Sequence, residues 1–176
     1  MWQLTALSHV QGPRVLELGC GPGHLVATMA ARGHSCCALD NSTGMLKQAR
    51  KNVAKQGAPV GVIRALAHHL PFSSGSYDTV VLCFSGLAWL PQVLGECRRV
   101  LGPSGLLLVV DEVSFVRRSA RTAFVRAALS LFDCEEDSIP HEMPLRDAGF
   151  DVRVVDKPVD GDVVRLLLGR AAPSSQ

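Results

Sequence analysis

The sequence lacks the features that mark several common classes of protein. It has 18 Lys and Arg against 16 Asp and Glu, a net charge of +2, so it lacks the strongly basic character of a general nucleic-acid binder. No basic segment followed by an apolar run opens the chain, and no apolar run is long enough to span a membrane. We therefore expect a cytoplasmic protein with no membrane span that binds no nucleic acid.

The cysteines also lack the spacing of a metal site, because no two of them form a C-x-x-C pair. Most fall within apolar strand or helix patterns, which favours buried free thiols over metal ligands. A disulfide framework is not expected in a chain of 176 residues, which can build a sizeable core. The adjacent His68 and His69 have no third ligand nearby in sequence, so we expect no metal.

The most informative stretch is residues 15–23, V-L-E-L-G-C-G-P-G. It reads as a short apolar strand that contains an acid and ends in glycines at alternate positions. Residues 24–32 follow with helical spacing of apolar side chains. Glycine accepts positive φ and lets the backbone approach a ligand, and the start of a helix presents free N–H groups. The stretch therefore predicts a ligand-binding turn.

Strands alternate with helices along the rest of the chain, which predicts an α/β fold with a parallel sheet. We expect strands at 14–18, 35–40, 60–64, 77–83, 106–111, 150–155 and 163–168, and helices at 24–32, 43–56, 90–101, 115–132 and 145–148. The last two strands are too close for a crossover helix, so they form an antiparallel hairpin. The prediction is a doubly wound, mostly parallel seven-stranded sheet in one domain (1–176), with a lead-in at 1–13 and a flexible tail at 171–176.

Four segments occur in an order that resembles the class I S-adenosylmethionine-dependent methyltransferases, in the small-molecule branch of the ubiquinone and menaquinone methyltransferases. They are E-x-G-x-G-x-G at 17–23, D-N-S-T-G-M-L at 40–46, L-P-F with S-Y-D within 70–78, and L-G-E-C-R-R-V-L-G-P-S-G at 94–105. The resemblance implies the Rossmann-like methyltransferase fold, S-adenosylmethionine as cofactor and S-adenosylhomocysteine as product. Within the last segment, Glu96 and Arg99 are better explained as a packing pair than as catalytic residues.

Asp40 closes the second strand, and a carboxylate at that place can accept hydrogen bonds from both ribose hydroxyls of an adenosine. The alternatives are a solvated acid or an N-cap for the next helix. The resemblance places Asn41 and the pair Leu66–Ala67 beside the adenine, and we expect Met45 to begin the core face of its helix. The candidate cofactor-binding residues are Glu17, Gly19, Cys20, Gly21, Gly23, Asp40, Asn41, Met45, Leu66, Ala67 and Cys83.

On the acceptor side the candidates are Phe84, Ser85, Trp89 and His141. No catalytic residue is assigned, because a base is needed only if the acceptor must lose a proton. The acceptor is expected to be a small molecule that the sequence does not identify.

Two departures from the family favour an alternative function. Leu66–Ala67 stands where the family has an acid that receives the adenine amino group, and only residues 1–13 precede the strand that leads into the glycine turn. The alternative is a catalytically weak or inactive methyltransferase-like subunit, with a protein partner or a second copy covering its open acceptor side. A nicotinamide-dependent oxidoreductase is a third alternative, but His24 stands at the third glycine of the G-x-G-x-x-G pattern.

Overall fold

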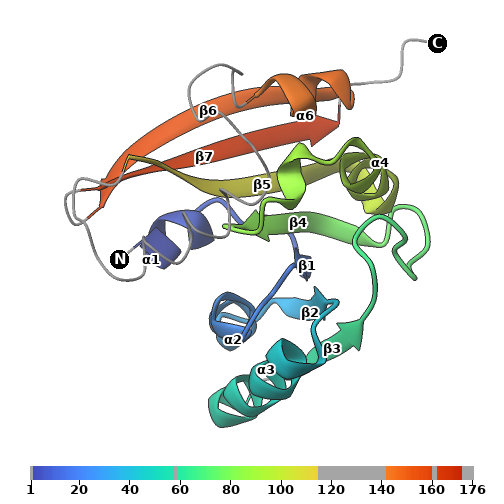
Figure 1. The fold of residues 1–176 in the computed structure, drawn as a ribbon, viewed down its shortest axis with the longest axis vertical. Helices are drawn as coiled ribbons and strands as arrows, with labels where there is room; N and C mark the ends of the chain where they lie inside the picture. The colour runs from blue at the N-terminus through green and yellow to red at the C-terminus, as the bar shows by residue number, and fades with distance from the viewer. Residues whose placement is uncertain (1, 58, 115–141, 160–161, 172–176) are drawn as a thin grey trace.

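A computed structural model describes residues 2–57, 59–114, 142–159 and 162–171. These residues form a seven-stranded sheet in the order β3-β2-β1-β4-β5-β7-β6, with helices on both faces (Figure 1). The strands are β1 (Arg14–Leu18), β2 (Ser35–Asp40), β3 (Val60–Arg64), β4 (Tyr77–Cys83), β5 (Leu101–Ser114), β6 (Phe150–Val159) and β7 (Asp162–Ala171). The helices are α1 (Trp2–Leu7), α2 (His24–Ala31), α3 (Thr43–Gln56), the 3-10 helix η1 (Leu87–Trp89), α4 (Pro91–Val100) and α6 (Met143–Asp147).

The predicted architecture is confirmed. β1 pairs in parallel with β2 and β4, β4 with β5, and β2 with β3, whereas β7 is antiparallel to both β5 and β6. The strand order reverses beside β1, between the β1–β2 and β1–β4 pairs. The carboxyl ends of β1, β2 and β4 therefore meet at the point of the sheet where doubly wound folds bind ligands.

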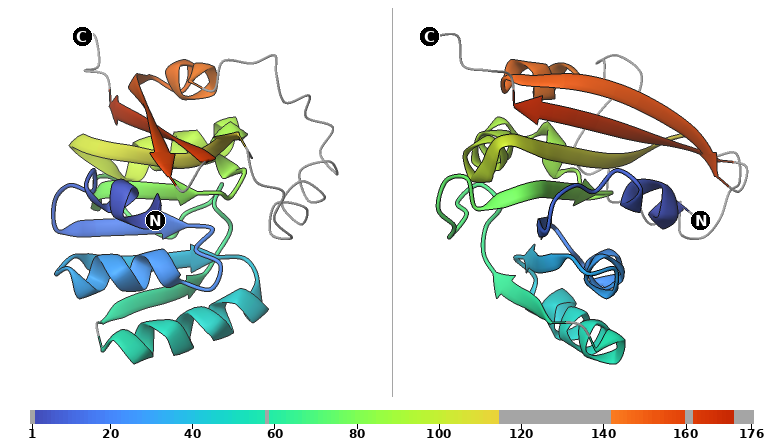
Figure 2. Two further views of the ribbon diagram at one scale, coloured as in Figure 1. Left: turned by 90° about the vertical axis from the view of Figure 1, so that its left-hand side faces the viewer. Right: turned by 180° about the vertical axis from the view of Figure 1, so that it is seen from behind.

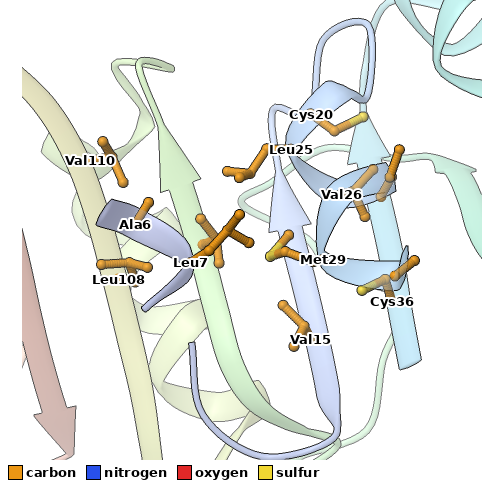
Figure 3. Close-up of a cluster of buried hydrophobic side chains, with 14 of the residues drawn as sticks. Ala6, Leu7, Val15, Cys20, Leu25, Val26, Met29, Cys36, Leu108 and Val110 are labelled. Atoms are coloured by element: carbon orange, nitrogen blue, oxygen red, sulfur yellow. The ribbon is translucent and has the colours of Figure 1, made fainter. Parts of the chain in front are cut away.

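Two helical layers cover the central strands because these strands are apolar on both faces. Successive residues of β1 alternate between the layers: Val15 packs with α1, α2 and α3, while Leu16 and Leu18 pack with α4 and η1. The views in Figure 2 show α2 and α3 on one face of the sheet and α4 on the other. In Figure 3, Leu7 of α1 and Met29 of α2 lie in one cluster with Val15.

Helix α3 has clear sequence signals at both ends. Its N-cap Ser42 accepts a hydrogen bond from the Met45 N–H at 3.3 Å, and Gly57 ends the helix with φ of 67°. The buried stripe begins at Leu46, and the expectation that Met45 begins the core face is wrong because 45% of Met45 is exposed. Leu46 takes the inward-facing position in this turn of the helix, and Met45 lies 100° from it around the axis, on the side exposed to solvent.

Several element bounds differ from the predicted ones. β5 begins at Leu101 because that residue already pairs with Tyr77 across the G-P-S-G turn, and the hairpin strands are longer than the apolar runs alone indicate. The predicted helix at 115–132 lies outside the described residues. Among the helices that the structure describes, none has both the length and the apolar character needed to cross a bilayer.

Candidate functional site

The glycine turn lies between β1 and α2, and all three alternate glycines have positive φ. A Cβ on Gly23 would lie 2.9 Å from the Cβ of Ala49 in α3, and one on Gly19 would lie 3.0 Å from the Cβ of Ser85. These two glycines allow the turn to pack against its neighbours. A Cβ on Gly21 would meet no atom within 4 Å, so Gly21 presents the open side of the turn to a ligand.

The backbone N–H groups of this turn donate to the chain itself. Those of Gly19 and Cys20 both donate to the carbonyl of Leu39, at 2.8 and 3.1 Å, and that of Gly23 donates to the carbonyl of Cys20 at 2.9 Å. The N–H of Gly21 donates to Asp40 Oδ2 at 2.9 Å. A turn that binds a pyrophosphate leaves its N–H groups pointing at the ligand. Residues 19–23 do not present free N–H groups in this way, which argues against a dinucleotide-binding site.

Glu17 is the buried acid of the site, with 3% of its surface exposed. One carboxyl oxygen accepts a hydrogen bond from the N–H of Val26 in the first turn of α2, while Oε2 has no partner among the described residues. Burial raises the pKa of Glu17 to about 8; the Val26 bond opposes this shift and the nearby Asp40 carboxylate adds to it. An unpartnered buried oxygen is unusual and indicates a place for a ligand or water.

Asp40 connects the two loops of the site. Its Oδ2 accepts from Gly21 N–H and its Oδ1 accepts from Ser42 N–H at 2.8 Å, so one side chain holds the glycine turn against the start of α3. Ser42 is the N-cap of α3, so the N-cap alternative for Asp40 is wrong. Each carboxylate oxygen can accept a second hydrogen bond, so the pair that two ribose hydroxyls need is still available. No local pattern in the sequence indicates this bridging role.

The predicted adenine side lies at the carboxyl ends of β2 and β3. The N–H of Ala65 donates to the carbonyl of Asp40 at 3.3 Å, which places the loop that follows beside that acid. Leu66 is 50% exposed and forms an isolated antiparallel bridge with His69, so it is not part of the core. Asn41 is exposed, and its carbonyl accepts from Arg64 Nε at 3.1 Å; Ala67 is half-buried.

Glu96 and Arg99 hold the L-P-F loop in place. They form an ion pair of 2.7 Å; Glu96 also accepts from the N–H of Leu70 at 2.7 Å, and Arg99 donates to the carbonyls of Leu70 at 3.1 Å and Phe72 at 2.6 Å. The bond from Arg99 lowers the pKa of Glu96 to about 2. This geometry gives the pair the packing role that the sequence indicated.

Three of the four predicted acceptor-side residues come together where β4 ends beside β5. Phe84, Ser85 and Trp89 line a small cavity there, and half-buried Cys83 lies one residue before it in the chain. Phe84 has a φ of 47°, the one positive value among the described non-glycine residues, and such backbone is often found at functional sites. His141 lies outside the described residues.

Asp111 lines the same cavity at the carboxyl end of β5, and the sequence analysis missed it. The available signal was V-V-D at the end of an apolar strand, the same pattern that singled out Asp40. A larger cavity of about 450 Å³ opens at the opposite end of the sheet, at the amino ends of the strands that begin with Arg14, Ser35 and Tyr77. None of the predicted site residues lines it. Within the described residues no group of three His, Cys, Asp or Glu could hold a metal ion.

Comparison with known proteins gives the same family as the motifs. A family model described as a methyltransferase domain matches residues 15–105, just over half of the chain. The chain belongs to that family. The predicted class, the S-adenosylmethionine-dependent methyltransferases, is thereby confirmed, which leaves the nicotinamide-dependent alternative without support.

Relatives of this methyltransferase domain agree in sequence and in fold. The uncharacterized methyltransferase YodH of Bacillus subtilis is 36% identical over 101 residues, which are 55% of this chain and 42% of that protein. A demethylmenaquinone methyltransferase of Clavibacter sepedonicus is 34% identical over 128 residues, covering 67% and 51% of the two chains. A solved SAM-dependent methyltransferase from Aquifex aeolicus shares the fold, with a TM-score of 0.72, 20% identity and coverage of 96% and 87%. The chain spans about half the length of these curated relatives.

Proposed function

We propose that this domain binds S-adenosylmethionine and transfers its methyl group to a small-molecule acceptor. The observation that carries the proposal is the glycine turn with its open side at Gly21, set between two strand-end carboxyl groups, Glu17 and Asp40. The unpartnered oxygen of Glu17 and the remaining acceptor capacity of Asp40 fit a ligand that brings an ammonium group and a ribose. The relative named a demethylmenaquinone methyltransferase supports a small-molecule acceptor.

Each end of the cofactor has candidate residues in this site. Asp40 would accept from the ribose hydroxyls, and Glu17 would lie near the ammonium group, directly or through water. Exposed Met45 and Leu66 offer apolar surface to the adenine. The adenine amino group then finds backbone or water instead of the acid that the family places at Leu66.

Bound S-adenosylmethionine supplies a methyl group that its sulfonium already makes electrophilic. The chain therefore needs to contribute mainly proximity and alignment of the acceptor. Phe84, Ser85 and Trp89 lie at the strand ends where the acceptor would be oriented, and Asp111 is the acid that lines the same small cavity. No base is assigned, because an acceptor that is already a nucleophile needs none.

The alternative subunit function rests on Leu66–Ala67, which removes one polar contact to the adenine. The match of the methyltransferase domain supports the enzyme over this alternative. A protein partner or a second copy over the acceptor side stays a prediction, which the molecular mass in solution tests.

The experiment is a calorimetric titration of the protein with S-adenosylmethionine and with S-adenosylhomocysteine. We expect each ligand to bind at one site. The Asp40→Ala variant should lose about 1.5–3 kcal/mol of binding free energy, the scale of hydrogen bonds to a charged group. Arg14→Ala is the matched control, because it breaks an ion pair with Asp78 at the amino ends of β1 and β4, away from the glycine turn. Absence of binding by either ligand would overturn the proposed function, and equal affinity in Asp40→Ala would overturn the ribose assignment.

A further inference from the structure

We propose that Glu17 is protonated in the free protein and releases its proton to the solvent when the ammonium group of the cofactor binds. The inference rests on the proposed function and adds to it the change in protonation of Glu17 that accompanies binding. Its consequence is that cofactor affinity depends on pH through one identified side chain.

The geometry of Glu17 requires a hydrogen-bond donor that none of the described residues supplies. The N–H of Val26 satisfies one carboxyl oxygen, and within the part of the chain that the structure describes Oε2 has no partner, in a side chain that is 3% exposed. A buried, unpaired carboxylate is costly, so in the absence of a ligand the neutral carboxyl group is the stable form. An ammonium group carries both the N–H donors and the positive charge that the carboxylate lacks.

The ionisable groups around Glu17 act in the same direction. Asp40 and Cys36 lie on β2, Cys20 lies in the glycine turn and Cys83 lies at the end of β4. Burial, together with the nearby Glu17, raises the pKa of each of these thiols, so they are uncharged at neutral pH, and the groups that perturb them or Glu17 are acids or thiols. From α2, the only ionisable side chain is that of His24, which is exposed.

The proton balance of the binding step is simple. The O–H bond of the neutral carboxyl breaks, its proton passes to the buffer, and the carboxylate accepts a hydrogen bond from the ammonium N–H. Because the pKa of Glu17 is about 8 in the free protein, most molecules carry the proton at pH 7. By linkage, affinity should tighten up to tenfold per pH unit between pH 6 and pH 7 and level off above pH 8.

The test is calorimetry at pH 7 in phosphate and in Tris, whose different ionisation enthalpies report the protons exchanged on binding. The ligands are S-adenosylmethionine, S-adenosylhomocysteine and 5′-methylthioadenosine, which lacks the ammonium group. We expect release of most of one proton with the first two and none with the third. Glu17→Gln should bind S-adenosylmethionine and S-adenosylhomocysteine more weakly and without releasing a proton. Asp151 is exposed at the start of β6, so the control variant Asp151→Asn should behave like the parent.

Each outcome distinguishes the inference from the proposed function. Binding of S-adenosylmethionine with no proton release, or equal release in Glu17→Gln, overturns the inference alone. Release with S-adenosylmethionine but not with S-adenosylhomocysteine would assign the sensed charge to the sulfonium and overturn the ammonium assignment. Absence of binding overturns both proposals. If Glu17→Gln does not fold, the carbon-13 shift of the Glu17 carboxyl in the free parent decides: titration near pH 4.5 overturns the inference, and titration near pH 8 supports it.

Discussion

Glu17 and Glu96 carry the same carboxyl group in opposite surroundings. Arg99 and the N–H of Leu70 satisfy Glu96, and the pKa of Glu96 falls to about 2. Among the described residues Glu17 has one backbone donor and an oxygen without a partner, and its pKa rises to about 8. The first acid belongs to the loop anchor, defined as Glu96, Arg99, Leu70 and Phe72. The second belongs to the ligand turn, defined as residues 17–23 with Asp40.

The difference separates a region that stabilises the fold from the region that we propose as the binding site. Polar groups that the chain satisfies itself, as in the loop anchor, stabilise the fold. Polar groups that lack a hydrogen-bond partner among the described residues, and space that no side chain fills, are available to a ligand, as in the ligand turn. Variants of the anchor should therefore change stability first, whereas variants of the turn should change binding first.

The largest expected effect is the pH dependence of stability caused by Glu17. Its folded pKa, about 8, lies above the unfolded value of 4.5, so its stabilising contribution is complete below pH 4.5 and is lost as pH rises through 8. At 1.36 kcal/mol per pKa unit, the loss is about 3–5 kcal/mol across this window. Denaturant unfolding from pH 4 to pH 9 should show this decline in the parent and not in Glu17→Gln. Parallel curves for the two proteins would show that Glu17 ionises freely in the fold.

Next in size is the loss of binding in Gly21→Val. The new side chain would enter the open space that we assign to the ligand, so we expect affinity for S-adenosylhomocysteine to fall at least ~100-fold, about 2.7 kcal/mol. Gly57→Val is the matched control, because Gly57 has a φ of 67° and equally open surroundings at the end of α3. Both variants should lose about 1–2 kcal/mol of stability through backbone strain. Equal affinity in the two would show that the turn is only structural.

The loop anchor should respond differently to Arg99→Ala. This change removes donors to two carbonyls and leaves Glu96 without its ion-pair partner, and we expect about 2 kcal/mol of lost stability because the pair is partly exposed. Arg50→Ala, which removes one 3.2 Å bond to the Val62 carbonyl, should lose less than ~0.5 kcal/mol. Thermal unfolding of both variants provides the measurement. An Arg99→Ala protein as stable as the parent would show that the loop anchor does not stabilise the fold.

The smallest expected effect is a gain of affinity in Leu66→Asp. Because Leu66 is 50% exposed, an acid there avoids burial, so the variant should keep its stability. A new acceptor for the adenine amino group should tighten binding about tenfold, or about 1.4 kcal/mol. Leu90→Asp is the control, since Leu90 is similarly exposed at 45% but lies before α4. No gain over that control would show that Leu66 does not face the adenine.

Much of the fold and the family could be predicted because the deciding patterns are local. Alternating strands and helices, the glycine turn and the acid after β2 depend on residues close together in the chain, and their periodicity predicts the sheet. The sequence also indicated that Glu96 and Arg99 pack together, because residues three apart on a helix are neighbours. These features determined the parallel sheet, its antiparallel hairpin and the place of the site.

The tertiary structure alone decided how the polar groups are satisfied. Gly21 donates to Asp40 and Gly19 to the Leu39 carbonyl, contacts that span 19 and 20 positions of sequence and exist only because β1 and β2 pair. The exposure of Met45 and the placement of Asp111 beside the cavity likewise depend on what packs nearby. Most of all, the sequence shows Glu17 as an acid in a strand, but its unpartnered oxygen and raised pKa come from the helix and strands that exclude water around it.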